Sequence, residues 1–218
     1  RRRPDRHEFG YLTNLSLEAE LIRRELTDET AVWEATAYDE LRERVAASLT
    51  VSIRDARGRV TERELAPHAV EAAAVYAVLS RLDAEDLPAD VGLVEKALLF
   101  DRGWIRDGDE RIEGDAFEFD GSDGTHGIPV TYTRDVIATL LQSERDRHHP
   151  DLPVESVVTP EDVLDGMAAG LADAPVFSRA EAAEYAHRVA AAKEHVIEPP
   201  AEAVLDEELV ERGLEQWT

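Results

Sequence analysis

The chain has 218 residues, and its 48 Asp and Glu residues outnumber its 24 Lys and Arg residues, so the formal net charge is −24. This charge argues against a nucleic-acid binder, because affinity for nucleic acid comes mainly from Lys and Arg side chains that neutralise phosphates. The absence of cysteine excludes disulfides, thiol catalysis and thiolate metal sites.

No apolar run approaches the roughly 18 residues that a membrane-spanning helix needs, and no apolar signal core follows the first three arginines. We therefore predict a cytoplasmic protein without a membrane partner. Only Lys96 and Lys193 are lysines, and an acidic surface with scarce lysine is typical of a halophile, whose molar salt screens carboxylate repulsion. Because the first residue is not Met, we expect a piece of a longer protein.

The N-terminal part is predicted to be a linker followed by two helices. Residues 1–14 have the composition of a linker. A helix over 16–26 is expected to begin at Ser16 as its N-cap and to turn Leu17 inward. Apolar residues at spacings of three and four then predict a second helix over 37–49.

A short hairpin and a buried helix are expected next. Residues 51–53 and 59–60 flank a turn that contains glycine, which is typical of a hairpin. Residues 61–64 match a capping box, and Pro67 suits a first helical turn. The run over 67–82 is apolar almost all round, so it is predicted to be the central helix of the core.

Helix character resumes over 91–100, and an acidic segment follows. Residues 101–125 carry five glycines and nine carboxylates, with 111–113 and 116–119 as the strand candidates. We predict an acidic hairpin and loop for this segment.

The C-terminal part is predicted to be helical up to a pair of prolines. Helices are expected over 133–145 and, behind a Thr-Pro-Glu-Asp start, over 159–171. A capping box at Ser178 is expected to open a long helix that ends at Pro199. The acidic tail over 201–218 is weakly specified.

The predicted fold class is mainly α: a multi-helix lid or bundle with one or two small β-hairpins, one of which could belong to a winged-helix-like element. The expected organisation is a linker with a helical and hairpin segment over 1–63, a lid-like region over 64–150, and a C-terminal helical region with a weakly ordered acidic tail over 151–218. DNA binding through a winged helix is disfavoured by the charge.

No familiar catalytic motif is present, including the phosphate loop, the dinucleotide fingerprint, the zinc-protease helix, the nucleophile elbow and the eukaryotic-type kinase signatures. We assign no catalytic residue and expect no ATP hydrolysis by the chain alone. The adjacent His148 and His149 are predicted to lie in a solvated helix end, and residues 120–123 in a plain turn. We expect no metal site and no cofactor in this chain.

Three segments in order resemble the PrkA family of AAA+ serine protein kinases. They are Ala66-Pro67-His68-Ala69 running into the apolar stretch that ends at Leu82, residues 93–101, and the Gly-Ile-Pro-Val-Thr run that opens 127–137. The match is good over about 64–142, loose for the helices after 159, and weak over 27–63. The resemblance implies the lid and C-terminal region of such a kinase, with ATP and magnesium bound by an N-terminal AAA+ core outside this chain.

The resemblance also supplies candidate nucleotide-sensing residues. Thr131 stands where the family's run carries an arginine, and Arg134 lies three residues on, on the same helical face. An AAA+ lid often contributes an arginine to the phosphates, so Arg134 is a candidate phosphate sensor, with the alternative that it is a surface arginine paired to a carboxylate. His68, at the start of the buried helix, is another candidate contact.

Two functions follow as predictions. The first is the regulatory and lid region of a PrkA-like kinase, inactive alone, whose partners are its own AAA+ core and a protein substrate. The second is a non-catalytic module for protein interaction or homo-oligomerisation.

Overall fold

The computed structural model describes residues 10–27, 37–54, 57–84, 87, 91–107, 110–119, 121–143 and 157–196. This part of the chain is mainly helical with two small sheets, as predicted. The helices are α1 (Leu15–Thr27), α2 (Tyr38–Ala46), α3 (Ala69–Leu79), α4 (Leu93–Arg102), α5 (Val130–Gln142), α6 (Pro160–Leu171), α7 (Arg179–His187) and α8 (Val189–Val196). The strands are β1 (Leu49–Arg54), β2 (Val60–Leu65), β3 (Trp104–Asp107), β4 (Glu110–Glu113) and β5 (Val157–Val158).

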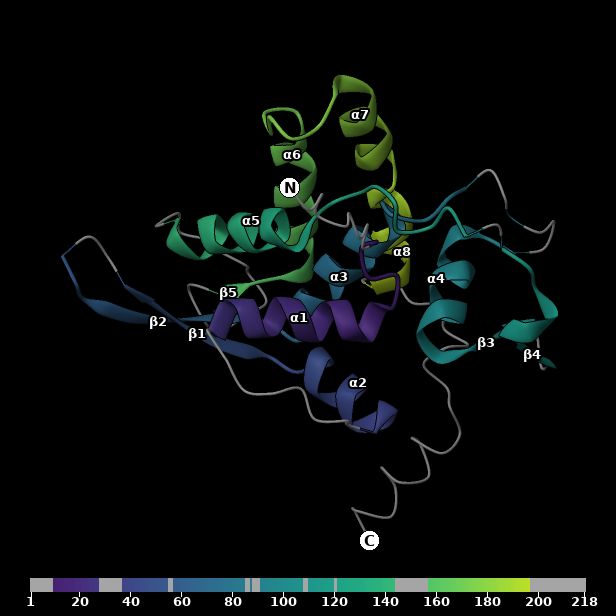
Figure 1. Ribbon diagram of the computed structural model, residues 1–218. Helices are drawn as coiled ribbons and strands as arrows, with labels where there is room; N and C mark the ends of the chain where they lie inside the picture. Colours follow the sequence, from purple (N-terminus) through teal and green to yellow (C-terminus); the bar gives the residue numbers. More distant parts are fainter. Residues whose placement is uncertain are drawn as a thin grey trace, which may run out of the picture.

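Helix α3 is the centre of the molecule. Every residue of Ala69–Leu79 is buried, which agrees with a sequence that is apolar on all sides. The helix packs against α1, α2, α4, α5, α6 and α8 (Figure 1). Its four central alanines allow neighbouring helices to approach its backbone closely. The largest core cluster includes residues from each of the predicted regions 1–63, 64–150 and 151–218.

Helix α1 begins one residue earlier than predicted, and a different face is buried. The side chain of Asn14 accepts a hydrogen bond from the backbone N–H of Leu17 at 2.8 Å, so Asn14 is the capping residue rather than Ser16. Leu17 is exposed, whereas Glu18 and Glu20 are buried. The prediction that Leu17 faces inward was wrong, because the inner face of α1 includes these two glutamates, both of which have arginine partners inside the fold.

The predicted hairpin is real but longer. Strands β1 and β2 pair antiparallel from Leu49 opposite Leu65 to Arg54 opposite Val60, and β5 adds a short parallel strand beside the end of β2. The capping box predicted at 61–64 is wrong, because these residues lie within β2. Val60 and Thr61 are β-branched and suit a strand, and pairing of 60–65 with β1 prevails over the local capping pattern.

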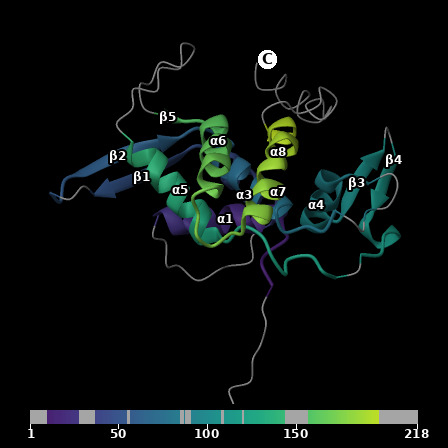
Figure 2. The same ribbon diagram turned by 90° about the horizontal axis from the view of Figure 1, so that it is seen from above.

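The acidic hairpin is formed by β3 and β4, which lie at the opposite end of the molecule from β1 and β2 (Figures 1 and 2). Strand β4 includes the predicted strand 111–113, but its partner β3 was not predicted. Residues 116–119 are not a strand, since Gly114–Ala116 is a 3₁₀ turn and an irregular stretch follows. Ile105 and Ile112 belong to the same apolar cluster as Leu99, and this packing holds the hairpin against α4.

Two predicted helix starts are confirmed in atomic detail. Thr159 and Asp162 form a reciprocal capping box at the start of α6, and Ser178 and Glu181 form another at the start of α7. The long helix predicted after Ser178 is instead divided at Arg188 into α7 and α8. The predicted end at Pro199 and the tail over 201–218 lie outside the described residues.

Candidate functional site

Three segments of the chain, over 66–82, 93–101 and 127–137, meet in space at the C-terminal end of α3. The first includes α3, the second is α4, and the third runs from the loop before α5 into that helix. Charged and polar side chains fill the contact between them. We call this group the α3 junction and define it by these residues: Glu18, Ser80, Arg81, Asp83, Lys96, Asp123 and Arg188.

Arg81 ties the end of α3 to α1 and to the loop before α5. Its guanidinium donates to the carboxylate of Glu18 at 2.7 Å, to the carbonyl of Leu12 at 2.7 Å and to the carbonyl of Ile128 at 2.6 and 3.0 Å. The side chains of Arg81 and Glu18 are each only 1% exposed. A fully buried pair of this kind needs its remaining donors satisfied, and the two carbonyls satisfy them.

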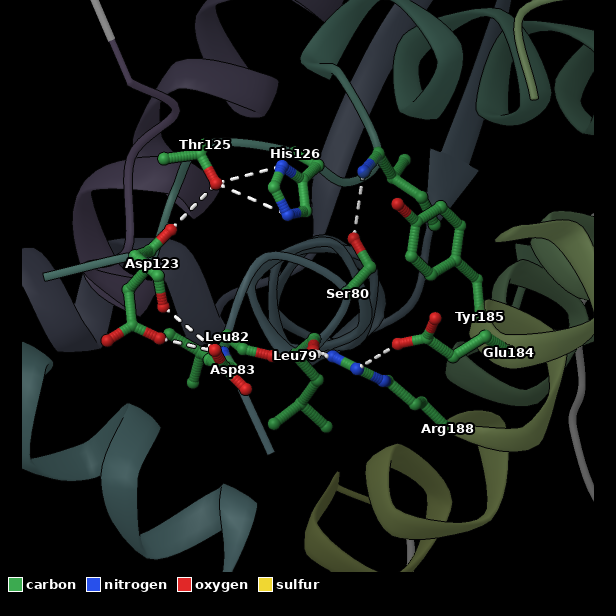
Figure 3. A network of polar contacts seen from close by, with 12 residues as sticks. Leu79, Ser80, Leu82, Asp83, Asp123, Thr125, His126, Glu184, Tyr185 and Arg188 are labelled. Carbon is green, nitrogen blue, oxygen red and sulfur yellow. Dashed lines mark hydrogen bonds and ion pairs between the residues drawn. The ribbon is translucent and has the colours of Figure 1, made fainter. Parts of the chain in front are cut away.

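Ser80 and Gly127 join the same loop to the helix. The hydroxyl of Ser80 donates to the carbonyl of Ala77 at 2.6 Å and accepts from the backbone N–H of Ile128 at 2.8 Å (Figure 3). Gly127 has φ +120°, and a Cβ there would lie 2.9 Å from the carbonyl oxygen of Ser80. Glycine is therefore required for the loop to approach α3 this closely.

Lys96 forms the connection to α4. Its ammonium, fully buried, lies 3.0 Å from the carbonyl of Asp83 and 3.0 Å from Oδ1 of Asp123, and 4.8 Å from the centroid of the Phe119 ring. The backbone N–H of Asp83 donates to the same Oδ1 at 2.8 Å. The other oxygen of Asp123, Oδ2, is buried without a hydrogen-bond partner.

Arg188 closes the junction from the side of α7 and α8. Its guanidinium donates to the carbonyls of Leu79 and Leu82, and it pairs with Glu184 (Figure 3). The last carbonyls of a helix lack partners within the helix, and cations suit this end of its dipole. The α3 junction thus neutralises its charges internally, so it is built to hold elements together rather than to perform acid–base chemistry.

A smaller charged group lies at the other end of α3. His68 has φ +64°, the one positive φ of a non-glycine residue within the described ranges, and its backbone N–H donates to the carbonyl of Ala46 at 2.9 Å. Its Nδ1 lies 2.7 Å from Oε2 of Glu71, whose other oxygen pairs with Arg42. Burial alone would raise the pKa of Glu71, but Arg42 and His68 outweigh it, and the pKa is lowered.

Arg134 lies on the surface near the start of α5. Its side chain is 38% exposed and pairs with Glu25 of α1 at 3.2 Å and with Asp135 at 2.9 Å. This is the alternative that the sequence left open, a surface arginine paired with carboxylates. Thr131 is exposed one turn earlier. Whether Arg134 senses phosphate stays a prediction.

The structure does not bring the three candidates together. Arg134 and Thr131 lie on α5, which packs on α1 and α6, whereas His68 contacts α2 and the start of α3. Within the described ranges no cluster of side chains could hold a metal ion. His148, His149 and Asp120, which the sequence weighed as metal ligands, lie outside those ranges.

Sequence reasoning missed the residues that form the α3 junction. Glu18, Arg81 and Lys96 each interrupt or end an apolar run, and a charged residue among buried neighbours is a signal for a buried ion pair. Their partners lie far along the chain, however: Glu18 and Arg81 are 63 positions apart.

In the part of the chain that the structure describes, no helix combines the length and the apolar character needed to cross a membrane.

Comparisons of the chain with models of protein families, with curated protein sequences and with solved structures find no significant match.

Proposed function

We propose that the chain is the regulatory and lid region of a PrkA-like AAA+ serine protein kinase. It would act on an ATP-binding core that supplies the phosphate loop and the magnesium. The observation that carries the proposal is the convergence at the α3 junction. Arg81 and Ser80 join the first and third segments that resemble the family, and Lys96 joins the second to Asp83, the residue that follows the first.

The physical role follows from this connection. An AAA+ lid responds to nucleotide by moving as a rigid body, which requires its helices to move together. Ile128, which precedes α5, is hydrogen-bonded to both Ser80 and Arg81 at the end of α3. In this proposal a displacement of α5 therefore displaces the central helix with it. In this proposal Arg134 leaves Glu25 to contact a phosphate when the lid closes.

ATP turnover tests the proposal. The chain alone, given ATP and Mg²⁺, is expected to release no phosphate, whereas the chain joined to an AAA+ core of the family is expected to turn ATP over. Arg134→Ala in the joined protein should lower turnover by about tenfold or more, because a group that stabilises phosphate charge is lost. Arg179→Ala, at an exposed position at the start of α7, is the matched control.

Two results would oppose the proposal. Hydrolysis by the chain alone would show an activity of its own. Equal turnover for Arg134→Ala and for the unaltered joined protein would rule out Arg134 as a phosphate sensor. Equal turnover by the AAA+ core with and without this chain would rule out its role as a lid.

A second candidate is a module for protein interaction or homo-oligomerisation, and one observation favours it. The outer half of the β1–β2 hairpin extends away from the helices, and most of the outer residues of β2 are exposed, including Val60 at 55% (Figure 1). A projecting ribbon that exposes an apolar residue suits contact with another chain. Light scattering in high salt tests it, since a lid without its core should be a monomer and an oligomerisation module should not.

A further inference from the structure

Three arginines surround a tryptophan on the β3–β4 hairpin. The guanidinium carbons of Arg102, Arg111 and Arg106 lie 3.9, 4.6 and 5.8 Å from the centroid of the Trp104 ring. Such distances are within the range of cation–π attraction. Residues 104–113 also carry four carboxylates, so the three guanidinium groups gather around one ring in a segment of mixed charge.

The strand register places this charge on one face. Arg106 and Arg111 are directly opposite each other, and Trp104 is opposite Glu113. Because side chains two residues apart share a face of a strand, these four lie on the same face. The other face carries Ile105 and Ile112, which pack towards α4. By the same alternation Asp107 and Glu110 share the face of the two isoleucines, so Arg106 and Arg111 lie on the face of Trp104 and both faces carry carboxylates.

Two like charges directly opposite each other destabilise a strand pair. Attraction to the ring offsets part of this cost, and Glu113 accepts from Arg111 at 2.6 and 3.4 Å. Arg102, the last residue of α4, adds a third positive charge beside the same ring. It is half-buried, and its Nε–H is fixed by the carbonyl of Trp104 at 2.9 Å. Burial lowers the pKa of Arg102, and the nearby Arg106 also lowers it, although Tyr38 and Asp101 oppose the change.

We propose that the Trp104 face of the β3–β4 hairpin binds a phosphoryl group, with Arg102, Arg106 and Arg111 as its ligands. The planar guanidinium fork matches the oxygens of a phosphate, and a doubly charged phosphate offsets the repulsion between adjacent arginines. The ring is already in contact with three guanidinium groups, so the site recognises the charge of the phosphoryl group rather than an aromatic base. This inference goes beyond the proposed function and does not depend on it.

Phosphoryl groups reach such a site either on a phosphorylated side chain or on a nucleotide, and one assay separates them. Trp33→Phe and Trp217→Phe leave Trp104 as the sole tryptophan, so its fluorescence reports binding at the hairpin. Two pairs of probes are titrated: a phosphoserine peptide with its unphosphorylated form, and ATP without magnesium with adenosine. The salt is the lowest concentration that preserves the circular dichroism spectrum.

We expect a saturable change in Trp104 fluorescence with the phosphorylated member of at least one pair, and no change with its unphosphorylated partner. The pair that responds at lower concentration identifies the source. Arg106→Gln with Arg111→Gln should weaken binding about tenfold or more, because charge-assisted hydrogen bonds are lost. Arg57→Gln, at the exposed turn of the other hairpin, is the control and should leave binding unchanged.

Glu113→Gln gives a second, opposite test. It removes the carboxylate that competes for Arg111, so binding should strengthen severalfold. A purely structural role of the arginines would produce no such gain. The proposal is overturned if neither phosphorylated probe gives a saturable change, if both members of each pair act alike, or if the double arginine variant binds as well as the unaltered protein.

Discussion

The buried pair of Glu18 and Arg81 is the residue-scale feature with the largest expected effect on stability. Removing one partner leaves an unpaired charge in the interior, which costs about 3–5 kcal/mol. We expect Arg81→Ala to lower the free energy of unfolding by this amount, measured by urea denaturation in high salt. The exposed pair of Arg134 and Glu25 is the matched control, and Arg134→Ala should cost no more than about 1 kcal/mol. Equal costs would contradict the structure.

His195 is expected to make stability depend on pH. It lies on α8, and the charged groups that act on it are Glu71 of α3, Arg42 of α2, and Arg102 and Glu95 of α4. Burial lowers its pKa below the ordinary 6.5, so below that pH the unfolded chain binds more protons than the folded one. Stability contributed by neutral His195 is therefore present above pH 6.5 and declines as the pH falls.

His195→Gln tests this dependence. The urea midpoint of the unaltered protein should fall between pH 7.5 and 5.5, and the variant should show a smaller fall. His187→Gln, at the exposed end of α7, should behave like the unaltered protein. The pKa of Glu71 is lowered, so its own contribution is lost only at more acidic pH. An equal fall in all three proteins would rule out His195 as the cause.

At the scale of elements, the approach of the loop 121–128 to α3 depends on one glycine. Gly127 and Gly58 both have positive φ, but only Gly127 would place a Cβ against neighbours, at 2.5 Å from Cγ of Arg81. We expect Gly58→Ala to cost about 1 kcal/mol through its backbone alone. Gly127→Ala should cost about 3 kcal/mol or more, since the clash adds to the backbone strain. Urea denaturation of both variants compares them, and similar costs would show that the loop can move away from α3.

Short sequence patterns predicted some elements correctly and missed others. The outcome depends on whether the contacts that decide the local conformation lie within one helical turn or far apart in the sequence. The capping boxes at Thr159 and Ser178 are confirmed because both partners are within one helical turn. The same pattern at 61–64 failed, since pairing with β1 decides the conformation there. The break between α7 and α8 was also missed, because it forms where Arg188 bonds carbonyls about 106 residues away.

At the scale of the whole molecule, the net charge of −24 remains a property of the surface. Within the described ranges the cations of the α3 junction are compensated by particular carboxylates, and most of the other carboxylates are exposed. Removing salt lengthens the range of their repulsion from about 3 Å at 1 M to about 30 Å at 0.01 M. We predict that the chain loses helical circular dichroism on dialysis to about 10 mM salt. A spectrum unchanged at that concentration would count against adaptation to high salt.

The sequence by itself determined the mainly helical class, the central position of α3 and the caps of α6 and α7. These depend on the spacing of apolar residues and on contacts within a single turn. Only the tertiary structure decided which charged residues are buried and what they bind. Arg81 pairs with Glu18, and Lys96 pairs with Asp123. The physical reason is that a charge can be buried only beside its partner, and packing, not local spacing, brings these partners together.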